Sequence, residues 1–489
     1  MCGICGTNNM KADIESTLDT MQRGKDERTI ISNNGVIFGF QRHAIVAPHE
    51  SQTQPCQTED QILVANGELF NFQQIAQRIP GYKLSASSVD IDVLHRILLE
   101  EGMGTVESLN MMMAAAVYDT RKRALHLFRD WIGENPLHYT YDLQSKEWFF
   151  ASSIAAVIKG TKKSVSEVME VPPGHIVTID SEGIKTHKYY DVQETPDIED
   201  VDRQTATKNV RAMLEKSAAE RTWTEVPTCS LISGGIDSLI TTYLLLKYGN
   251  FKGPLPVYTF HCSDFEETEE TERTDIYHAR KVAAWFGDKV DHRIITASKD
   301  EIIAAIPEVV RSLEDTRGRD FNIFTAMYNR FLAEAISKDG IKLVYEGEGP
   351  DEALGSYSSW REFTFSDEEI GQQKFRKKML TNLHKGVLLR TSKVMMEFGP
   401  LECRSFFLDR ELLTYLASLP ASVVRDARTK KAILLEAFKN DIPEELLARP
   451  KARPQDSTGI TDVLSEHIKK TGVNFRQMLL EHFEKIRTA

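Results

Sequence analysis

Two glycine-rich turns, each directly after a short apolar strand pattern, constrain the fold of this chain more than any other feature. The first turn, Ser233-Gly234-Gly235-Ile236-Asp237-Ser238, follows a strand pattern at residues 228–232 and precedes an apolar helical run at residues 239–246. The second turn, residues 346–352, follows a strand pattern at residues 342–345. Strands that alternate with helices predict a doubly wound parallel sheet, whose ligands bind at the carboxyl ends of the strands. We therefore expect the two turns to face the same crevice.

The first turn has the composition of a phosphate-binding loop. Glycines let the backbone approach a phosphate, hydroxyl and N–H groups donate to it, and a helix N-terminus favours the anion. Asp237 adds an oxygen ligand of the kind that Mg²⁺ prefers. The turn lacks the lysine of a Walker A loop, which disfavours ordinary transfer of a γ-phosphate. The alternative interpretation is a Gly-Gly turn without a ligand.

The second turn, Glu346-Gly347-Glu348-Gly349-Pro350-Asp351-Glu352, is acidic as well as glycine-rich. If both turns face one crevice, Asp237 and Asp351 can share a magnesium–pyrophosphate complex. Glu348 is then left for acid–base work on an attacking ammonia molecule. An acidic surface turn is the alternative interpretation.

The N-terminus offers a separate chemistry. In Met1-Cys2-Gly3-Ile4, the small second residue allows Met1 to be removed, which leaves a cysteine with a free α-amino group. Such an amine has a reference pKa of about 8 and can act as general base for its own thiol. The alternative is an accidental cysteine near a frayed terminus.

Up to about residue 190, the chain shows short strand patterns separated by turns, which is typical of a sheet-rich α+β domain. Asn66-Gly67-Glu68 is expected to follow a strand that ends at Ala65, where an amide and a glycine N–H can point at one oxyanion. A simple Asn-Gly turn is the alternative. Arg42 can hold a substrate carboxylate, and Asp90 can hold a substrate ammonium group.

An acidic, aperiodic stretch that contains Pro196 predicts a linker. The chain is accordingly expected to divide into a domain at residues 1–190, a linker at residues 191–206 and a second domain at residues 207–489. The second domain is expected to become mostly helical beyond residue 365. Residues 263–275 carry seven carboxylates, which favours a solvated loop over a functional lid.

Charge and apolar patterning narrow the expected partners and location. A formal net charge of −12 argues against a nucleic-acid partner, because phosphate binding favours a basic surface. No apolar run reaches the roughly 18 residues of a membrane span, and no secretory leader is indicated. The six cysteines, Cys2, Cys5, Cys56, Cys229, Cys262 and Cys403, lack metal-ligand spacing and fit a reducing compartment. We expect a cytoplasmic protein with neither a nucleic-acid nor a membrane partner.

The N-terminal motifs together resemble a known family. Cys2-Gly3-Ile4, Gln54-Pro55, residues 66–71, Asp90 and residues 129–137 occur in the order and spacing of the class II glutamine amidotransferase domain. The resemblance covers residues 1 to about 190 and implies an N-terminal-nucleophile hydrolase fold, an αββα sandwich. It implies that Cys2 attacks the side-chain amide of glutamine to give a thioester and ammonia. Asn66 and Gly67 would form the oxyanion hole, and the glutamine-binding set would be Arg42, Asn66, Glu68 and Asp90.

The two glycine-rich turns resemble the PP-loop ATP pyrophosphatase domain of glutamine-hydrolysing asparagine synthetases. The similarity continues through Glu402-Cys403-Arg404 and Thr429-Lys430-Lys431 to about Lys451. It implies that ATP adenylates an acceptor carboxylate, that ammonia arrives through an internal tunnel, and that Glu348 is catalytic. Asp237 and Asp351 would hold Mg²⁺. The implied ATP and diphosphate site comprises Leu231, Ser233, Gly234, Gly235, Asp237, Ser238, Glu346, Gly347 and Lys431.

The resemblance implies glutamine, ATP and aspartate as substrates, and a homodimer. The match is weaker where this chain reads Arg317-Gly318-Arg319-Asp320-Phe321-Asn322, because many relatives have threonines and an arginine for aspartate there. Arg319 is a candidate replacement for that arginine, and Glu346 stands where the family often has serine. An acceptor other than aspartate therefore stays open. A non-catalytic relative is a further alternative, which the retained Cys2, Asn66, Asp237, Glu348 and Asp351 disfavour.

Overall fold

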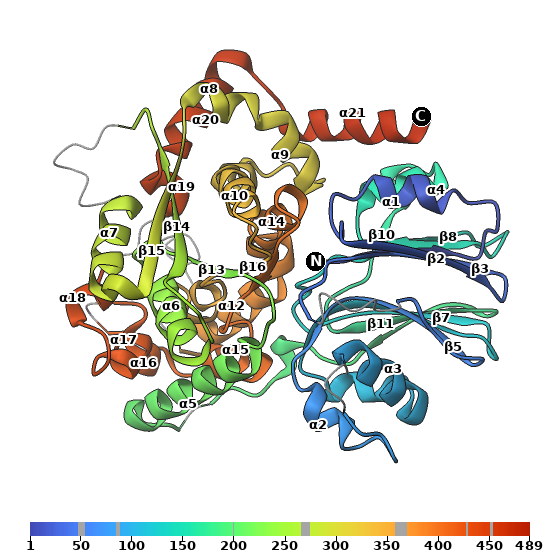
Figure 1. The fold of residues 1–489 in the computed structure, drawn as a ribbon, viewed down its shortest axis with the longest axis horizontal. Helices are drawn as coiled ribbons and strands as arrows, with labels where there is room; N and C mark the ends of the chain where they lie inside the picture. The colour runs from blue at the N-terminus through green and yellow to red at the C-terminus, as the bar shows by residue number, and fades with distance from the viewer. Residues whose placement is uncertain are drawn as a thin grey trace.

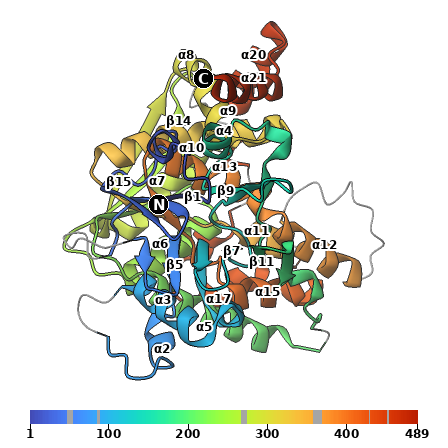
Figure 2. The ribbon, with the colours of Figure 1, turned by 90° about the vertical axis from the view of Figure 1, so that its right-hand side faces the viewer.

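The molecule consists of an N-terminal domain of two stacked sheets and a C-terminal domain built on one parallel sheet (Figure 1). A computed structural model describes residues 1–46, 54–84, 89–198, 200–265, 274–356, 369–426, 429–449 and 453–489. The N-terminus lies at the boundary between the two domains (Figure 1). In the view turned by 90°, the N-terminal domain lies in front of the C-terminal domain (Figure 2).

Sheet A of the N-terminal domain has six strands in the order β10-β8-β9-β1-β3-β2. Sheet B has six strands in the order β12-β11-β7-β6-β5-β4. The pairs within both sheets are antiparallel wherever their register is known. The strands of sheet A are β1 (Gly3–Thr7), β2 (Glu27–Asn33), β3 (Val36–Arg42), β8 (His138–Tyr141), β9 (Trp148–Ala151) and β10 (Met169–Glu170). Those of sheet B are β4 (Cys56–Gln57), β5 (Gln61–Leu69), β6 (Met111–Asp119), β7 (Ala124–Arg129), β11 (His175–Asp180) and β12 (Gly183–Lys188).

Helices cover the outer face of each sheet, which completes four layers (Figure 1). Helices α1 (Ile14–Asp19) and α4 (Ile154–Thr161) pack on sheet A, and α2 (Phe72–Ala76) and α3 (Asp90–Glu101) lie on the side of sheet B. Between the sheets, fully buried side chains such as Phe38, Phe150 and Leu127 form an apolar core. The predicted αββα sandwich is confirmed.

The C-terminal domain contains a five-stranded sheet in the order β15-β14-β13-β16-β17, and all of its pairs are parallel. Its strands are β13 (Thr228–Leu231), β14 (Leu255–Cys262), β15 (Val290–Ala297), β16 (Leu343–Tyr345) and β17 (Glu402–Arg404). The strand order reverses between β13 and β16, so the crevice at their carboxyl ends is the expected ligand position. The predicted doubly wound parallel sheet is confirmed.

Helices surround this sheet and make up most of the chain beyond residue 365, as predicted. The main helices beside the sheet are α5 (Arg203–Arg221), α6 (Ile236–Tyr248), α7 (Asp275–Phe286) and α10 (Asp320–Lys338). The others are α8 (Lys299–Ala304), α9 (Ile306–Leu313), α11 (Pro350–Leu354), α12 (Glu369–Thr381), α13 (Val387–Arg390), α14 (Ser392–Phe398), α15 (Arg410–Ser418), α16 (Ala421–Val424), α17 (Ala432–Phe438), α18 (Glu444–Leu447), α19 (Pro454–Ser457), α20 (Ile460–Thr471) and α21 (Phe475–Thr488).

Most of the acidic run at residues 263–275 lies outside the described residues, so its expected loop stays a prediction. Among the helices that the structure describes, none has the length and apolar character needed to cross a membrane.

A buried carboxylate joins the two domains. Glu314 follows α9 and accepts hydrogen bonds from the backbone N–H groups of Ile154 and Ala155, at the N-terminus of α4. Lys393 on α14 lies 2.7 Å from the same carboxylate. Burial raises the pKa of Glu314, but the Lys393 ammonium and the amide donors outweigh burial and hold it below its ordinary value. Glu314 is therefore an ionised clamp between the domains.

Replacing Glu314 should weaken the protein more than replacing a half-exposed acidic residue of α9, the helix that Glu314 follows. We expect Glu314→Gln to cost about 3 kcal/mol, because it leaves the Lys393 charge buried and unpaired. Glu308, which is half-exposed and pairs with Arg330 at 3.3 Å, provides the control, and Glu308→Gln should cost no more than about 0.5 kcal/mol. Urea denaturation midpoints compare the two, and equal midpoints would contradict this account.

Candidate active sites

Cys2 directly precedes β1, where the two sheets of the N-terminal domain meet. Its backbone N–H donates to Asn66 Oδ1 at 2.9 Å, which ties sheet A to sheet B at this point. Its Sγ accepts from the backbone N–H of His43 at 3.4 Å. Desolvation raises the pKa of the Cys2 thiol to about 11, although the nearby N-terminal amine opposes this. The thiol is therefore protonated at neutral pH and needs a base.

Asn66 is fully buried and oriented for two tasks. Its Oδ1 is used by Cys2, while its Nδ2 has no hydrogen-bond partner among the described residues. A buried amide donor without an acceptor is unusual in a native protein. Its backbone oxygen accepts from Asn135 Nδ2 at 3.0 Å, so the motif at residues 129–137 holds Asn66 in place. The side chain that holds the Cys2 nitrogen thus keeps an N–H group without an acceptor in the part of the chain that the structure describes.

Gly67 needs to be glycine for two reasons. Its φ of +143° is rarely adopted by other residues, and a Cβ atom there would lie 1.8 Å from Met112 O. The expectation that Asn66-Gly67-Glu68 follows the end of a strand is wrong. Strand β5 continues to Leu69, because β6 pairs with its whole length. The alternative of a simple Asn-Gly turn fails for the same reason.

The structure groups Glu68 and Asp90 beside this strand. Asp90 is the first residue of α3, and its carboxylate accepts from the backbone N–H of Leu69 at 2.7 Å. Burial raises the pKa of Asp90 to about 6. The Glu68 carboxyl also has a raised pKa, through burial and the nearby carboxylates of Glu402 and Asp90. Arg42, at the end of β3 in the other sheet, contacts Val46 O at 3.1 Å and Glu27 at 3.5 Å.

The first glycine-rich turn wraps closely between β13, which ends at Leu231, and α6. Ser233 Oγ accepts from the backbone N–H of Gly235 and lies 3.3 Å from Ser238 Oγ. Gly234 has a φ of +76°, and a Cβ atom on it would lie 2.3 Å from the Cβ of His278. A side chain at this position would therefore displace the turn.

The two glycine-rich turns face each other, as expected. A Cβ atom on Gly347 would lie 2.8 Å from the backbone of Asp237 and Ser238, so only glycine allows this approach. Lys431, which precedes α17, hydrogen-bonds to Asp237 and lies 2.6 Å from Asp351 Oδ1. The three residues therefore meet although they come from three separate parts of the sequence.

Glu346 and Glu348 of the second turn have different hydrogen-bond partners. Ser392 Oγ donates to Glu346 Oε1 at 2.8 Å, and burial raises the pKa of the Glu346 carboxyl to about 7. The backbone oxygen of Glu348 accepts from Ser405 Oγ at 2.9 Å. Whether Glu346 contacts a nucleotide stays a prediction.

Arg449 is a residue at this site that the sequence analysis missed. Its guanidinium hydrogen-bonds to Ser233 O and donates to Asp275 Oδ1 at 2.6 Å, so it braces the first turn against the start of α7. Arg449 is separated from Ser233 by 216 positions in the sequence, and no local motif around it indicates a contact with the turn.

The segment that departs from the related family folds into its own polar cluster. Asp315 is buried and accepts from the Nε of Arg317 at 2.8 Å and from the Nδ2 of Asn322 at 2.6 Å. Arg390 lies over the Phe321 ring at 4.5 Å. Arg319 is exposed where α10 begins, so its expected substitution for the family's arginine stays a prediction.

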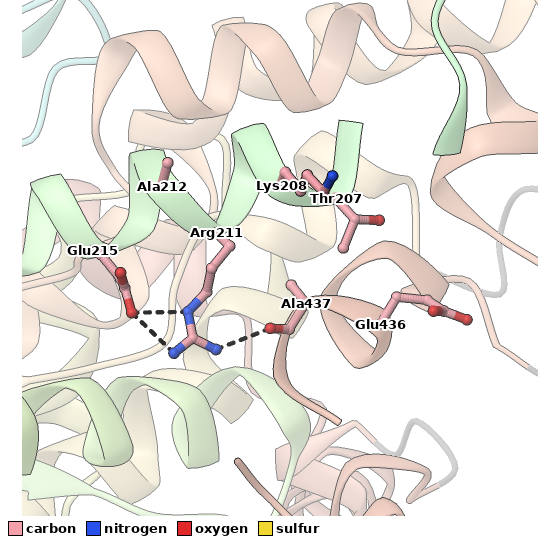
Figure 3. Close-up of a pocket in the computed structure, with 7 residues that line it drawn as sticks. All are labelled: Thr207, Lys208, Arg211, Ala212, Glu215, Glu436 and Ala437. Carbon is pink, nitrogen blue, oxygen red and sulfur yellow. Dashed lines mark hydrogen bonds and ion pairs between the residues drawn. The ribbon is translucent and has the colours of Figure 1, made fainter. Parts of the chain in front are cut away.

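An open hollow between α5 and α17 has a volume of about 310 Å³ (Figure 3). Arg211 lies in it but is held by Glu215 and by Ala437 O (Figure 3). None of the predicted site residues lines this hollow, so we do not assign it to either site.

The N-terminal part of the chain matches a known family of protein domains. Residues 1–167 match the family described as the glutamine amidotransferase domain, in agreement with the Cys2 and Asn66 geometry. The chain is therefore a glutamine amidotransferase-type protein with an attached parallel-sheet domain. Residues 209–380 and 365–474 match the family described as asparagine synthase, which together spans more than half of the chain. The chain belongs to the asparagine synthase family.

Individual relatives agree with this assignment. A glutamine-hydrolysing asparagine synthetase of Brassica oleracea is 27% identical over 504 residues, which covers 98% of this chain and 82% of the relative. A second, from Lotus japonicus, is 28% identical over 498 residues and covers 96% and 80%. The glutamine phosphoribosylpyrophosphate amidotransferase structure from B. subtilis overlaps 47% of this chain and 61% of its own, at 16% identity and a TM-score of 0.32.

Glu346 should make stability depend on pH. Its folded pKa of about 7 exceeds the ordinary carboxyl value of 4.5, so the folded state holds a proton that the unfolded chain loses. Stability should therefore fall as pH rises through that window. We expect Glu346→Gln to raise the denaturation midpoint at pH 8.5, with a smaller gain at pH 5.5. A gain that is equal at both pH values would contradict the assigned pKa.

Proposed function

We propose that this protein transfers the amide nitrogen of glutamine to a carboxylate acceptor, aspartate, in an ATP-dependent reaction that yields asparagine, glutamate, AMP and diphosphate. The observation that carries the proposal is the orientation of Asn66. Its Oδ1 accepts a hydrogen bond from the Cys2 backbone nitrogen, and its buried Nδ2 has no acceptor among the residues that the structure describes. The paired glycine-rich turns of the C-terminal domain supply a second site for the released nitrogen.

The first half-reaction requires removal of Met1. The freed α-amine of Cys2 then takes the thiol proton, and Sγ forms a bond to the side-chain amide carbon of glutamine. Asn66 Nδ2 and the N–H of Gly67 would stabilise the oxyanion, a contribution of about 3 kcal/mol per donor in other enzymes. The C–N bond breaks, the amine returns its proton, and ammonia leaves. Water then hydrolyses the thioester to glutamate and restores the thiol.

Binding of glutamine would use the polar groups around this strand. Arg42 would pair with the α-carboxylate, and Glu68 and Asp90 would receive the α-ammonium group. Both acids are buried and have raised pKa values, so a bound cation would stabilise their ionised forms.

In the second half-reaction, an oxygen of the acceptor carboxylate attacks the α-phosphorus of ATP, and diphosphate leaves. Ammonia then attacks the acyl carbon, Glu348 accepts a proton from its nitrogen, and AMP leaves. The diphosphate would lie against the first turn at the N-terminus of α6. Lys431 would neutralise part of its charge. An internal tunnel would keep ammonia away from water, where most of it is protonated.

The residues at the second site fit magnesium. Asp237 and Asp351 place carboxylate oxygens around one cation, Lys431, and such oxygens are the ligands that Mg²⁺ prefers. Asp237 and Asp351 would hold the metal. When bound, it would neutralise charge on the phosphate oxygens of the nucleotide.

Three further proposals concern organisation. The domains would divide at residues 1–190 and 207–489, with residues 191–206 as linker, and the protein would form a homodimer. Its compartment would be the reducing cytoplasm, which is supported by the six free cysteines in the described chain.

An acceptor other than aspartate is the second candidate. It is favoured by the polar cluster at the departing segment, where Asp315 engages Arg317, and Arg390 donates to Asn322 Oδ1 at 3.4 Å. Arg317 is therefore already paired with a carboxylate of the protein itself. AMP release measured with a panel of carboxylic acids, with ammonia as nitrogen source, separates the candidates. Release with aspartate supports the first, and release with another acid alone refutes it.

Replacing the nucleophile should separate the two half-reactions. We expect Cys2→Ala to abolish synthesis from glutamine and to leave synthesis from added ammonia within about twofold of wild type, because the second site is intact. Cys5→Ala, on the strand that directly follows Cys2, is the matched control, since Cys5 is fully buried in a different apolar cluster. Loss of both activities in Cys2→Ala alone would mean that Cys2 serves folding or domain docking instead.

A further inference from the structure

Arg404 is a fully buried arginine that extends from the C-terminal domain to the glutamine site of the other domain. Its Nε donates to Glu402 Oε1 at 2.8 Å. Its Nη1 donates to the backbone oxygens of Arg221 at 3.0 Å and Trp223 at 2.9 Å. These three hydrogen bonds fix the plane of the guanidinium from within its own domain.

The remaining nitrogen of Arg404 points across the domain boundary. Its Nη2 makes no hydrogen bond among the described residues and lies 3.5 Å from Glu68 Oε1. The two side chains therefore form an ion pair whose N–O distance is slightly longer than that of a good hydrogen bond. Glu68 directly follows Asn66 and Gly67, so the contact is made at the glutaminase site.

The backbone of the same strand end is tied to the other active site. The carbonyl of Arg404 accepts from the backbone N–H of Glu346 at 3.0 Å, and Arg404 pairs with Tyr345 in the parallel register of β17 and β16. The next residue, Ser405, donates from its hydroxyl to Glu348 O. Two consecutive residues therefore connect Glu68 on one side with the second glycine-rich turn on the other.

We propose that Arg404 is a positioning residue that couples the two active sites: its guanidinium positions Glu68 for glutamine, and its backbone positions the turn that carries Glu346 and Glu348. The inference rests on the proposed function. Occupation of the second turn shifts the end of β17 and closes Nη2 onto Glu68. The effect on binding is reciprocal, as coupling between two ligand sites requires.

Electrostatics agree with this role. Burial, Glu402 and Asp90 all raise the pKa of the Glu68 carboxyl, and Arg404 opposes them. Arg404 thus favours the ionised form of Glu68, as does the nearby N-terminal amine. Its backbone hydrogen bonds require the planar fork of arginine, whose separate donors a lysine ammonium does not reproduce.

Arg404→Lys tests the proposal because it keeps the charge and removes the fork. The readout is the ratio of glutamate to AMP formed with glutamine, ATP and acceptor. Wild type should form the two in about equal amounts. Arg404→Lys should form glutamate in at least about threefold excess and raise the KM for glutamine about fivefold. Its kcat for ammonia-dependent synthesis should stay within about twofold.

Arg376→Lys is the matched control. Arg376 is also fully buried in the C-terminal domain and donates to backbone oxygens, those of Leu416 and Leu419. It should lose stability without changing the glutamate-to-AMP ratio. A folded Arg404→Lys with wild-type ratio and KM would overturn the proposal. So would a shift of equal size in Arg376→Lys.

A second variant covers the case in which Arg404→Lys does not fold. Glu402→Gln keeps the shape of the group that anchors Nε and removes its charge, so it should shift the ratio in the same direction but less. An unchanged ratio in Glu402→Gln would also count against the coupling role. If wild type itself shows neither glutamine hydrolysis nor AMP formation, the proposed function fails, and this result is distinct from an unchanged ratio.

Discussion

The hydrogen bond from the Cys2 nitrogen to Asn66 Oδ1 is the constraint on which the N-terminal site depends. The proposed nucleophile, Cys2, directly precedes a strand of sheet A, and the proposed oxyanion donors belong to sheet B, so neither sheet would form the site alone. The bond also commits Oδ1 of the Asn66 amide to the Cys2 backbone nitrogen and leaves Nδ2 for another acceptor. Stacking of the two sheets through their shared apolar core therefore brings Asn66, whose Nδ2 has no acceptor among the described residues, to Cys2.

The domain boundary extends this arrangement to the second site. Met1 is buried at the boundary with Met112 and with Met396 of the C-terminal domain, so the N-terminus lies inside the interface. Removal of Met1 would both free the amine and vacate the space that its side chain fills. Glu314 and Arg404 add charged contacts across the same boundary. Glu314 contacts the N-terminus of α4, and Arg404 contacts Glu68 on β5.

Much of the fold followed from local pattern. The strand–turn–helix pattern around Ser233 and the strand pattern before Glu346 predicted the two turns that line the crevice. Glycine-rich turns and apolar strands can be recognised from local sequence alone. The predicted end of β5 at Ala65 is wrong. Asn-Gly usually indicates a turn, and only the pairing with β6 shows that the strand continues. Arg404, Arg449 and Glu314 were not assigned roles, because their partners are far away in the sequence.

The central claim is that nitrogen released at Cys2 is consumed at the turn that carries Glu348 without mixing with solvent. Supplying glutamine labelled with ¹⁵N in its side-chain amide, together with an excess of unlabelled ammonium, tests this directly. Mass spectrometry of the amidated product should show predominantly ¹⁵N in the new amide. A label diluted to the isotopic composition of the solution would contradict the claim and make the two domains independent catalysts.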